Sequence, residues 1–197
     1  MKQILIISIL LSAISAFAAK PNLAREFFTE RCNSCHGAVS TDLDSPVLYG
    51  QKKEYIVKQL QDFQSGERND HIMLGEMNEI AKTLTDKEVD LVSTYLSNLS
   101  PCDYPPKDSG FAGDVKAGER ISQSCKKCHH AWIPGLEVPT LYGQKPNYIY
   151  KTLNAFKLNK RKNSDEMGHQ VKTISETDVR NVSAFYGVNM RCTIDDF

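Results

Sequence analysis

Two short stretches of the sequence each combine a pair of cysteines with a histidine. Residues 31–38 read RCNSCHGA and residues 124–131 read SCKKCHHA, so both hold the pattern Cys-x-x-Cys-His. This pattern is compatible with a zinc knuckle, with a thiol–disulfide pair and with covalent attachment of a c-type haem. The surroundings of the two copies have to decide between these three kinds of chemistry.

The zinc and thiol interpretations leave parts of the pattern unexplained. Zinc ribbons separate their two knuckles by about 15 to 20 residues, whereas Cys35 and Cys125 lie 90 positions apart. Thiol oxidoreductases carry the motif beside a βαβ pattern, which this sequence lacks. A haem c uses every residue, because both thiols add to the haem vinyl groups and the next histidine can reach the iron. The predicted covalent attachment residues are Cys32, Cys35, Cys125 and Cys128, and the predicted proximal iron ligands are His36 and His129.

The sequence is a tandem duplication. A shift of 93 positions superimposes PVLYGQKKEYI at 46–56 on PTLYGQKPNYI at 139–149, together with both cysteine motifs. Further along the shift falls to 90, and Met77 then matches Met167. The stretch at 100–113 contains three prolines and two glycines, which is typical of a linker. The predicted organisation is a first domain at 19–101, a linker at 102–113 and a second domain at 114–197.

The periodicity within each half is helical. Segments 22–32 and 114–125 lead into the cysteine motifs, and segment 52–63 repeats apolar residues at helical spacing. Segment 85–99 opens with Thr85 and Glu88, the pattern of a capping box. No convincing strand pattern is present, so both domains are predicted to be all-α. Such small helical domains bury little apolar surface, and a large cofactor in each would complete the core.

The N-terminus resembles an export signal. Residues 1–18 hold one basic residue, a short apolar run and a final Ala-Phe-Ala, which predicts a signal peptide cleaved near Ala18. The apolar run is too short for a comfortable membrane span. Lys and Arg total 24, as do Asp and Glu, so no overall charge attracts nucleic acid. We therefore expect an exported protein that does not bind nucleic acid.

The distal iron ligand separates electron transfer from catalysis. Methionine on the far side of a haem raises the reduction potential and closes the iron to substrates. Met77 and Met167 occupy equivalent places before the last helix of each half, so they are the predicted distal ligands. The other candidates in the mature chain are Met73, Met190, His71 and His169. An iron that lacked its methionine would favour the alternative function, a dihaem peroxidase-like enzyme or a gas sensor.

The order of these motifs resembles the dihaem cytochromes c4 over nearly all of the mature chain. Each half has the haem motif, then P-x-L-x-G-Q-x-x-x-Y, a helix, a methionine and a capped last helix. The resemblance implies two cytochrome-c-like domains related by pseudo-twofold symmetry, each around one covalent haem c with His/Met iron. It implies a periplasmic single-electron carrier in a respiratory chain, without enzymatic activity. The implied donor is a quinol-oxidising cytochrome complex, the implied acceptor is a haem-copper terminal oxidase, and these partners would bring the carrier to the membrane.

The resemblance also suggests roles for residues around each haem. The carbonyls of Pro46 and Pro139 would accept the N–H of the proximal imidazoles. Six further residues are expected either in haem contact or in ordinary core packing: Tyr49, Gln51, Tyr55, Tyr142, Gln144 and Tyr148. Arg68 and Arg161 are candidates for haem propionates, for the interface between domains or for solvated surface.

Two further cysteines follow the last helix of each half. Cys102 and Cys192 are equivalent positions, and in an exported protein a disulfide between them would join the two domain ends. Spacing alone does not decide whether they meet, so the disulfide stays one of two options beside free thiols.

Overall fold

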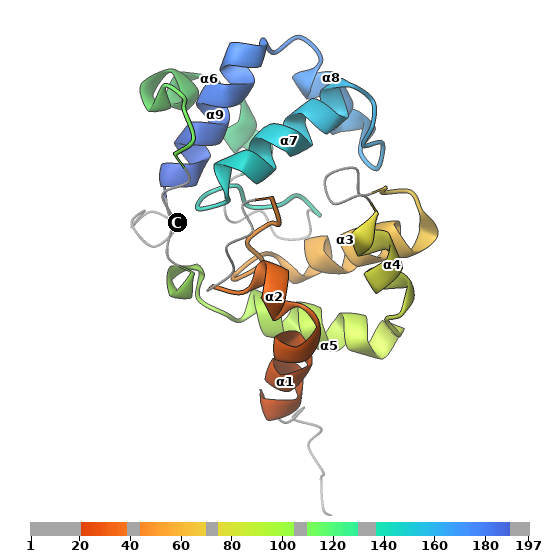
Figure 1. Cartoon of the computed structure of the whole chain (residues 1–197). Helices are drawn as coiled ribbons and strands as arrows, with labels where there is room; N and C mark the ends of the chain where they lie inside the picture. Colours follow the sequence, from red (N-terminus) through yellow and green to blue (C-terminus); the bar gives the residue numbers. More distant parts are fainter. Residues whose placement is uncertain (1–20, 39–43, 70–74, 105–109, 130–136, 190–197) are drawn as a thin grey trace, which may run out of the picture.

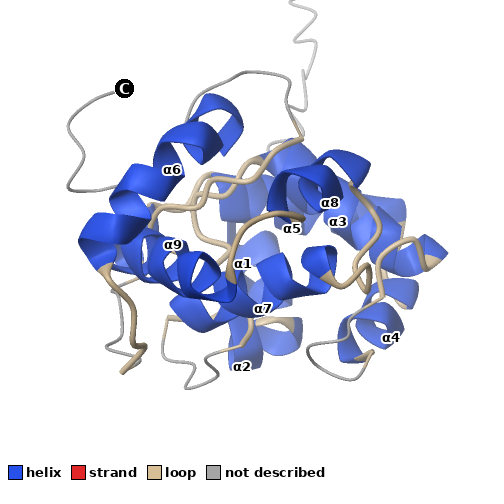
Figure 2. Cartoon of the chain, turned by 90° about the horizontal axis from the view of Figure 1, so that it is seen from above, coloured by secondary structure: helices blue, strands red, loops and turns tan. Residues whose placement is uncertain are grey.

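The computed structural model describes residues 21–38, 44–69, 75–104, 110–129 and 137–189. Within these ranges the regular elements are all helical and no strand occurs, as Figure 2 shows. The prediction of an all-α fold is therefore confirmed. No helix in the described part of the chain has the length and apolar character needed to cross a membrane. The predicted signal peptide at 1–18 lies outside the described residues.

The two halves repeat one order of elements. The first half contains α1 (Pro21–Arg31), α2 (Asn33–His36), α3 (Lys53–Ser65), α4 (Glu76–Lys82), α5 (Asp86–Ser97) and the 3₁₀ turn η1 (Pro101–Asp103). The second half contains α6 (Val115–His129), α7 (Pro146–Lys157), α8 (Asp165–Val171) and α9 (Glu176–Val188). In Figure 1 the second half, with α6 in green and the later helices cyan to blue, lies above the first half, which runs from red through yellow to light green.

The last helix of each half begins at a polar cap, which the sequence pattern predicts for the first half. Thr85 Oγ1 accepts from the backbone N–H of Glu88 at 3.3 Å, and Glu88 Oε2 accepts from the N–H of Thr85 at 2.8 Å. At the start of α9, Ser175 Oγ accepts from the N–H of Asp178 at 3.1 Å. These bonds satisfy N–H groups that have no partner within the helix.

Each half has its own apolar core, to which the last helix contributes most. In the first half Phe28 of α1 packs against Ile56 of α3 and against Val92 and Leu96 of α5. The buried core residues of the second half are Ile149, Val182, Phe185 and Tyr186. Burial of each such side chain contributes about 1.5–3 kcal/mol. Packing in these cores fixes the positions of the helices that carry the cysteine motifs and of those that carry the methionines.

A tight turn in each half is bonded to the last helix. Gly50 has φ 65° and Gly143 has φ 71°, a left-handed conformation that favours glycine. The N–H of Gly50 donates to the carbonyl of Leu96 at 2.9 Å, and Gly143 donates to Tyr186 at 2.9 Å. The residue after each glycine is therefore held in one direction, toward the other half of the molecule.

The start of the predicted linker is structured. Its first two residues form η1 together with Pro101 of the preceding domain, and Tyr104 directly after η1 is only 3 % exposed. The ring of Tyr104 packs edge-on against Tyr49 at 5.5 Å between centroids, and the ammonium of Lys145 lies 5.7 Å from the ring. This segment thus links the first half to the second before the chain enters α6.

Candidate functional site

The cysteine motifs lie at the ends of the first helix of each half. In the first half α1 ends at Arg31, Cys32 caps α2, and the N–H of His36 donates to the carbonyl of Cys32 at 3.0 Å. In the second half α6 continues without a break through Cys125 and Cys128 to His129. A spacing of three residues puts both thiols of a motif on one helical face, with the histidine directly behind them. This is the arrangement that two thioether bonds and one axial ligand need.

Both histidines are buried and held through the same ring nitrogen. His36 and His129 are each 6 % exposed. Nδ1 of His36 lies 2.9 Å from the carbonyl oxygen of Pro46, and Nδ1 of His129 lies 2.8 Å from that of Pro139. A carbonyl can only accept, so Nδ1 carries the proton and Nε2 keeps its lone pair. The donor set therefore fits an iron ligand with a fixed ring orientation.

The electrostatics of the motifs disfavour thiol–disulfide exchange. Burial raises the pKa of the Cys32 thiol to about 11 and also raises the pKa of Cys125. Thiol–disulfide exchange needs the opposite, a lowered pKa and an accessible thiolate. No group of three or more His, Cys, Asp or Glu side chains in the described ranges could hold a metal ion by itself. Burial lowers the pKa of His129, and the neutral imidazole is the form that binds a metal.

The two candidate methionines lie at the start of equivalent short helices. Met77 is in the first turn of α4 and Met167 in the first turn of α8, and both are half-buried. The N–H of Met167 donates to Ser164 Oγ at 3.3 Å, which fixes the start of α8. His169 on α8 is exposed. The remaining candidates, His71, Met73 and Met190, lie outside the described residues.

The tyrosines from the repeated motif divide into two kinds. Tyr49 and Tyr142 pack in aromatic clusters, Tyr49 against Phe28 at 6.0 Å and Tyr142 against Tyr186 at 5.1 Å between ring centroids. Tyr55 and Tyr148 instead accept hydrogen bonds through their hydroxyls from arginines of the opposite half. The first pair therefore takes part in core packing within its own half, whereas the second takes part in contacts between the halves.

The glutamines of the repeated motif cross the interface between the halves. Gln144 of the second half accepts from the N–H of Val47 at 2.7 Å and donates to the carbonyl of Val47 at 3.0 Å. Gln51 of the first half accepts from the N–H of Thr140 at 2.9 Å and donates to the carbonyl of Thr140 at 3.0 Å. The four residues are buried, with exposed fractions between 3 and 9 %. Two equivalent side chains thus make equivalent bonds in opposite directions, as pseudo-twofold symmetry requires.

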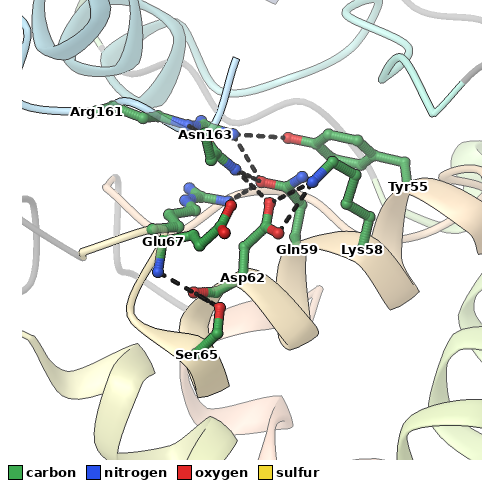
Figure 3. A network of polar contacts seen from close by, with 9 residues as sticks. Tyr55, Lys58, Gln59, Asp62, Ser65, Glu67, Arg161 and Asn163 are labelled. Carbon is green, nitrogen blue, oxygen red and sulfur yellow. Dashed lines mark hydrogen bonds and ion pairs between the residues drawn. The ribbon is translucent and has the colours of Figure 1, made fainter.

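A second cross-domain network gathers around Gln59 on α3, as Figure 3 shows. Gln59 Oε1 accepts from Arg68 at 2.8 Å, from Arg161 at 2.7 Å and from Asn163 at 3.0 Å. Arg68 also donates to the hydroxyl of Tyr148 at 3.0 Å, and Arg161 lies 3.4 Å from that of Tyr55. Arg68 and Arg161 are 7 and 8 % exposed, so they are interface residues rather than solvated surface. Two guanidiniums converge here from opposite halves, which suits carboxylates such as haem propionates.

Charges on the rim of the network pair across the same interface. Asp62 accepts from Lys58 one turn earlier on α3 at 2.9 Å, and from Asn163 of the second half at 2.7 Å. Lys151 on α7 forms an ion pair with Asp44 of the first half. Sequence reasoning missed Gln59, Asp62 and Asn163, since polar residues in an amphipathic helix or loop are ordinarily solvated. One signal was present in the sequence: Gln59 and Asp62 follow Tyr55 at helical spacing, so the three side chains lie on one face of α3.

The possible disulfide is half described. Cys102 is exposed and forms no disulfide with the residues that the structure describes. Its predicted partner Cys192 lies outside those residues.

Comparisons with known proteins agree on one family. The Cytochrome c family model matches residues 22–100. The chain is 32 % identical to the thiosulfate dehydrogenase electron acceptor of Stutzerimonas stutzeri, over 79 % of this chain and 77 % of that protein. It is 33 % identical to cytochrome c4 of Thiocapsa roseopersicina, over 64 % of this chain and 69 % of that protein.

A solved structure supports the same assignment. The cytochrome c4 structure from Acidithiobacillus ferrooxidans superimposes with a TM-score of 0.70 at 25 % identity, over 81 % of this chain and 98 % of that one. Its two-domain helical fold matches the duplicated arrangement found here. The chain therefore belongs to the dihaem cytochrome c4 family, the electron carriers that hold two covalently attached haem c groups.

Proposed function

We propose that this protein is an exported shuttle that moves single electrons between two His/Met-ligated irons and its redox partners. Cys32 and Cys35 attach one haem, whose iron is bound by His36 and Met77. Cys125, Cys128, His129 and Met167 bind the second haem in the same way. The bound haem supplies the ferric–ferrous couple. The observation that carries the proposal is the pair of buried histidines, each with Nδ1 bonded to a proline carbonyl.

The protein's own residues set the conditions for electron transfer. The proline carbonyls hold each imidazole in one orientation and increase its basicity toward the metal. The two methionines would close the irons to small ligands and raise their potentials. Arg68 and Arg161 offer buried guanidiniums to the propionates at the interface. Together these groups favour electron exchange over binding of a substrate.

The ligand assignment is tested by spectroscopy of the oxidised holoprotein. Methionine bound to ferric haem gives a weak near-infrared band, and two such haems should give twice the intensity of one. Met77→Leu and Met167→Leu should each remove half of the band and lower the potential of one haem. Unchanged spectra in both variants would refute the methionine assignment. A half-intensity band in the wild type, or carbon monoxide binding to the native ferrous protein, would favour the peroxidase-like enzyme or gas sensor.

We further propose that a periplasmic thiosulfate dehydrogenase is the electron donor and a haem-copper terminal oxidase the acceptor. The name of the Stutzerimonas stutzeri relative supports this donor over the quinol-oxidising cytochrome complex. The charges of the chain suit a carrier with two different partners: residues 19–101 contain nine Lys/Arg and thirteen Asp/Glu, and residues 114–197 contain thirteen and nine. Opposite net charges on the two halves steer partners of opposite charge to opposite ends.

The donor is identified by rapid-mixing kinetics. The oxidised holoprotein is mixed with a purified thiosulfate dehydrogenase and thiosulfate, and in parallel with a quinol-oxidising complex and quinol. We expect fast haem reduction by the dehydrogenase, slowed by added salt because charged surfaces steer the encounter. Reduction only by the quinol-oxidising complex would contradict this donor and leave the electron-carrier function intact.

The location is proposed from the N-terminus. An exported protein cleaved after Ala18 would begin at Ala19 and acquire its haems outside the cytoplasm. Mass spectrometry of the periplasmic fraction should find this N-terminus with two haem additions. A chain that retained residues 1–18 would contradict cleavage.

A further inference from the structure

The turn that holds each proximal histidine is bonded to a glutamine of the opposite half. Pro46, whose carbonyl lies 2.9 Å from His36 Nδ1, directly precedes Val47, and both backbone polar groups of Val47 bind Gln144. Pro139, whose carbonyl lies 2.8 Å from His129 Nδ1, directly precedes Thr140, which binds Gln51 in the same way. In Figure 1 these loops, orange and cyan, meet between the two halves.

We propose that Gln51 and Gln144 are positioning residues that act crosswise, each fixing the proximal histidine of the opposite domain. Gln51 of the first domain holds the Pro139–Thr140 loop and thereby the imidazole of His129. Gln144 of the second domain holds the Pro46–Val47 loop and thereby the imidazole of His36. The inference rests on the proposed role of both histidines as iron ligands.

Each glutamine side chain is held in one orientation by a further hydrogen bond. Gln51 Oε1 also accepts from the N–H of Lys52 at 3.0 Å, and Gln144 Oε1 accepts from that of Lys145 at 3.0 Å. The backbone of each glutamine's own half therefore orients the side-chain amide toward the opposite loop. One oxygen accepts an N–H and one nitrogen donates to a carbonyl, a combination that glutamine supplies and glutamate does not. Both polar groups of one loop residue are bound, so the loop cannot rotate freely.

The consequence is a physical coupling between the two haem sites. The N–H to carbonyl bond of a proximal histidine makes the imidazole a stronger donor, which favours ferric iron and lowers the potential. Because the acceptor carbonyl is held from the opposite domain, loss of one glutamine should raise the potential of the haem in the other domain. The haem in the glutamine's own domain should keep its potential.

The test is the effect of Gln51→Leu and Gln144→Leu on each haem of the oxidised holoprotein. The readout is the deuterium exchange rate of the two imidazole Nδ1–H protons, which the paramagnetic iron shifts clear of other signals. Met77→His, which alters the shifts of the first haem only, assigns the signals. Loss of one or two hydrogen bonds of ordinary strength corresponds to roughly tenfold to hundredfold easier opening. We therefore expect exchange to accelerate by about that factor at His129 in Gln51→Leu and at His36 in Gln144→Leu.

Three further variants keep the test decisive. Gln51→Glu keeps the acceptor for the Thr140 N–H but sets a carboxylate oxygen against the Thr140 carbonyl, so it should also accelerate exchange at His129 and not at His36, and it serves if Gln51→Leu loads haem poorly. Gln61→Leu makes the same replacement at an exposed position of α3 and should change neither site. Asn163→Ala removes cross-domain bonds to Gln59 and Asp62, none of which involves Val47 or Thr140. It should therefore leave the exchange rates at both His36 and His129 unchanged.

Several outcomes would overturn the inference. They are acceleration at the histidine of the glutamine's own domain, equal acceleration at both histidines, no acceleration, or the same acceleration in Asn163→Ala. A wild-type protein without two shifted imidazole N–H signals would instead refute the proposed iron ligands. Potentiometric titration gives an independent check, because only the haem opposite the replaced glutamine should move to higher potential.

Discussion

Replacement of Arg161 by methionine tests whether the two domains stabilise each other through the buried interface. Arg161 Nη2 lies 2.7 Å from Gln59 Oε1 in the first half, and its Nε lies 2.9 Å from Asn163 Oδ1. Its guanidinium carbon also lies 4.5 Å from the ring centroid of Phe156. Methionine keeps the length and the contact with the ring and removes the charge and the donors.

The expected loss of stability is the balance of the hydrogen bonds removed, the desolvation penalty relieved and the acceptors left without Arg161. Two short bonds from a charged donor contribute about 3–6 kcal/mol together. Removal of a buried charge relieves its desolvation penalty, which offsets several kcal/mol of that sum. Gln59 Oε1 keeps Arg68 and Asn163 as donors, whereas Asn163 Oδ1 and the Tyr55 hydroxyl, the latter at a long 3.4 Å, lose their bonds from Arg161. We expect a decrease of about 2–3 kcal/mol in the free energy of unfolding.

The assay is guanidinium unfolding of the holoprotein followed by far-ultraviolet circular dichroism. Lys162→Met is the matched control, because Lys162 is exposed, adjacent and equal in charge; its effect should stay within about 0.5 kcal/mol. If the halves unfold in separate steps, Arg161→Met should weaken both steps, since its bonds reach Gln59 in the first half. A loss no larger than that of the control would show that the interface network contributes nothing to stability.

Two further predictions follow from the conformation of a turn and from a buried tyrosine. Gly143→Ala should lower the free energy of unfolding, measured by thermal denaturation, by about 1–2 kcal/mol, because a φ of 71° is strained for alanine. Gly168→Ala is the control and should not destabilise the protein, because an added Cβ there meets nothing within 4 Å. Burial raises the pKa of Tyr148, but the charges of Arg68 and Arg161 outweigh burial and lower it from 10.0 to about 8. The stability that ionised Tyr148 contributes is complete above pH 10 and is lost as the pH falls through 8, so wild type should gain stability relative to Tyr148→Phe between pH 8 and 10. Parallel pH profiles of the two proteins, measured by unfolding midpoints and absorbance at 295 nm, would contradict this direction.

The elements of the fold were predictable because their signals are local. The capping pair of Thr85 and Glu88 and the apolar spacing of Val89, Val92 and Leu96 lie within one helix, and the structure has this helix. The duplication was equally visible, since a shift of 93 positions aligns whole motifs. A helix cap or an apolar stripe depends on residues three or four positions away, so no knowledge of the other half is needed.

The contacts between the halves could not be predicted in the same way. Gln51 looks like part of a haem-binding motif, and nothing in PVLYGQK states that its amide reaches Thr140, 89 positions further along. Gln59 and Asp62 look like solvated residues of an amphipathic helix but are 8 and 6 % exposed. The partners of these side chains come from the opposite domain, so they depend on how the two folded domains pack. No local pattern in the sequence indicates that packing.

The two copies have also diverged in a way that favours pairing of unlike halves. Lys58 has Asp62 one turn later on its helix, whereas the equivalent Lys151 has Ala155 there and pairs with Asp44 of the first half instead. The first half therefore supplies both interface carboxylates, and the second half supplies Lys151 and Asn163 as their donors. The 93-residue shift matches Asp44 to Glu137 and Lys58 to Lys151, so the ion pair between Asp44 and Lys151 would have an equivalent in any arrangement of two halves. The same shift matches Asp62 to Ala155 and Asn163 to Asp70, so the bond between Asp62 and Asn163 exists only between unlike halves. Divergence at Asp62 and Asn163 thus favours one first half against one second half, the arrangement in which each glutamine reaches the histidine loop of the other domain.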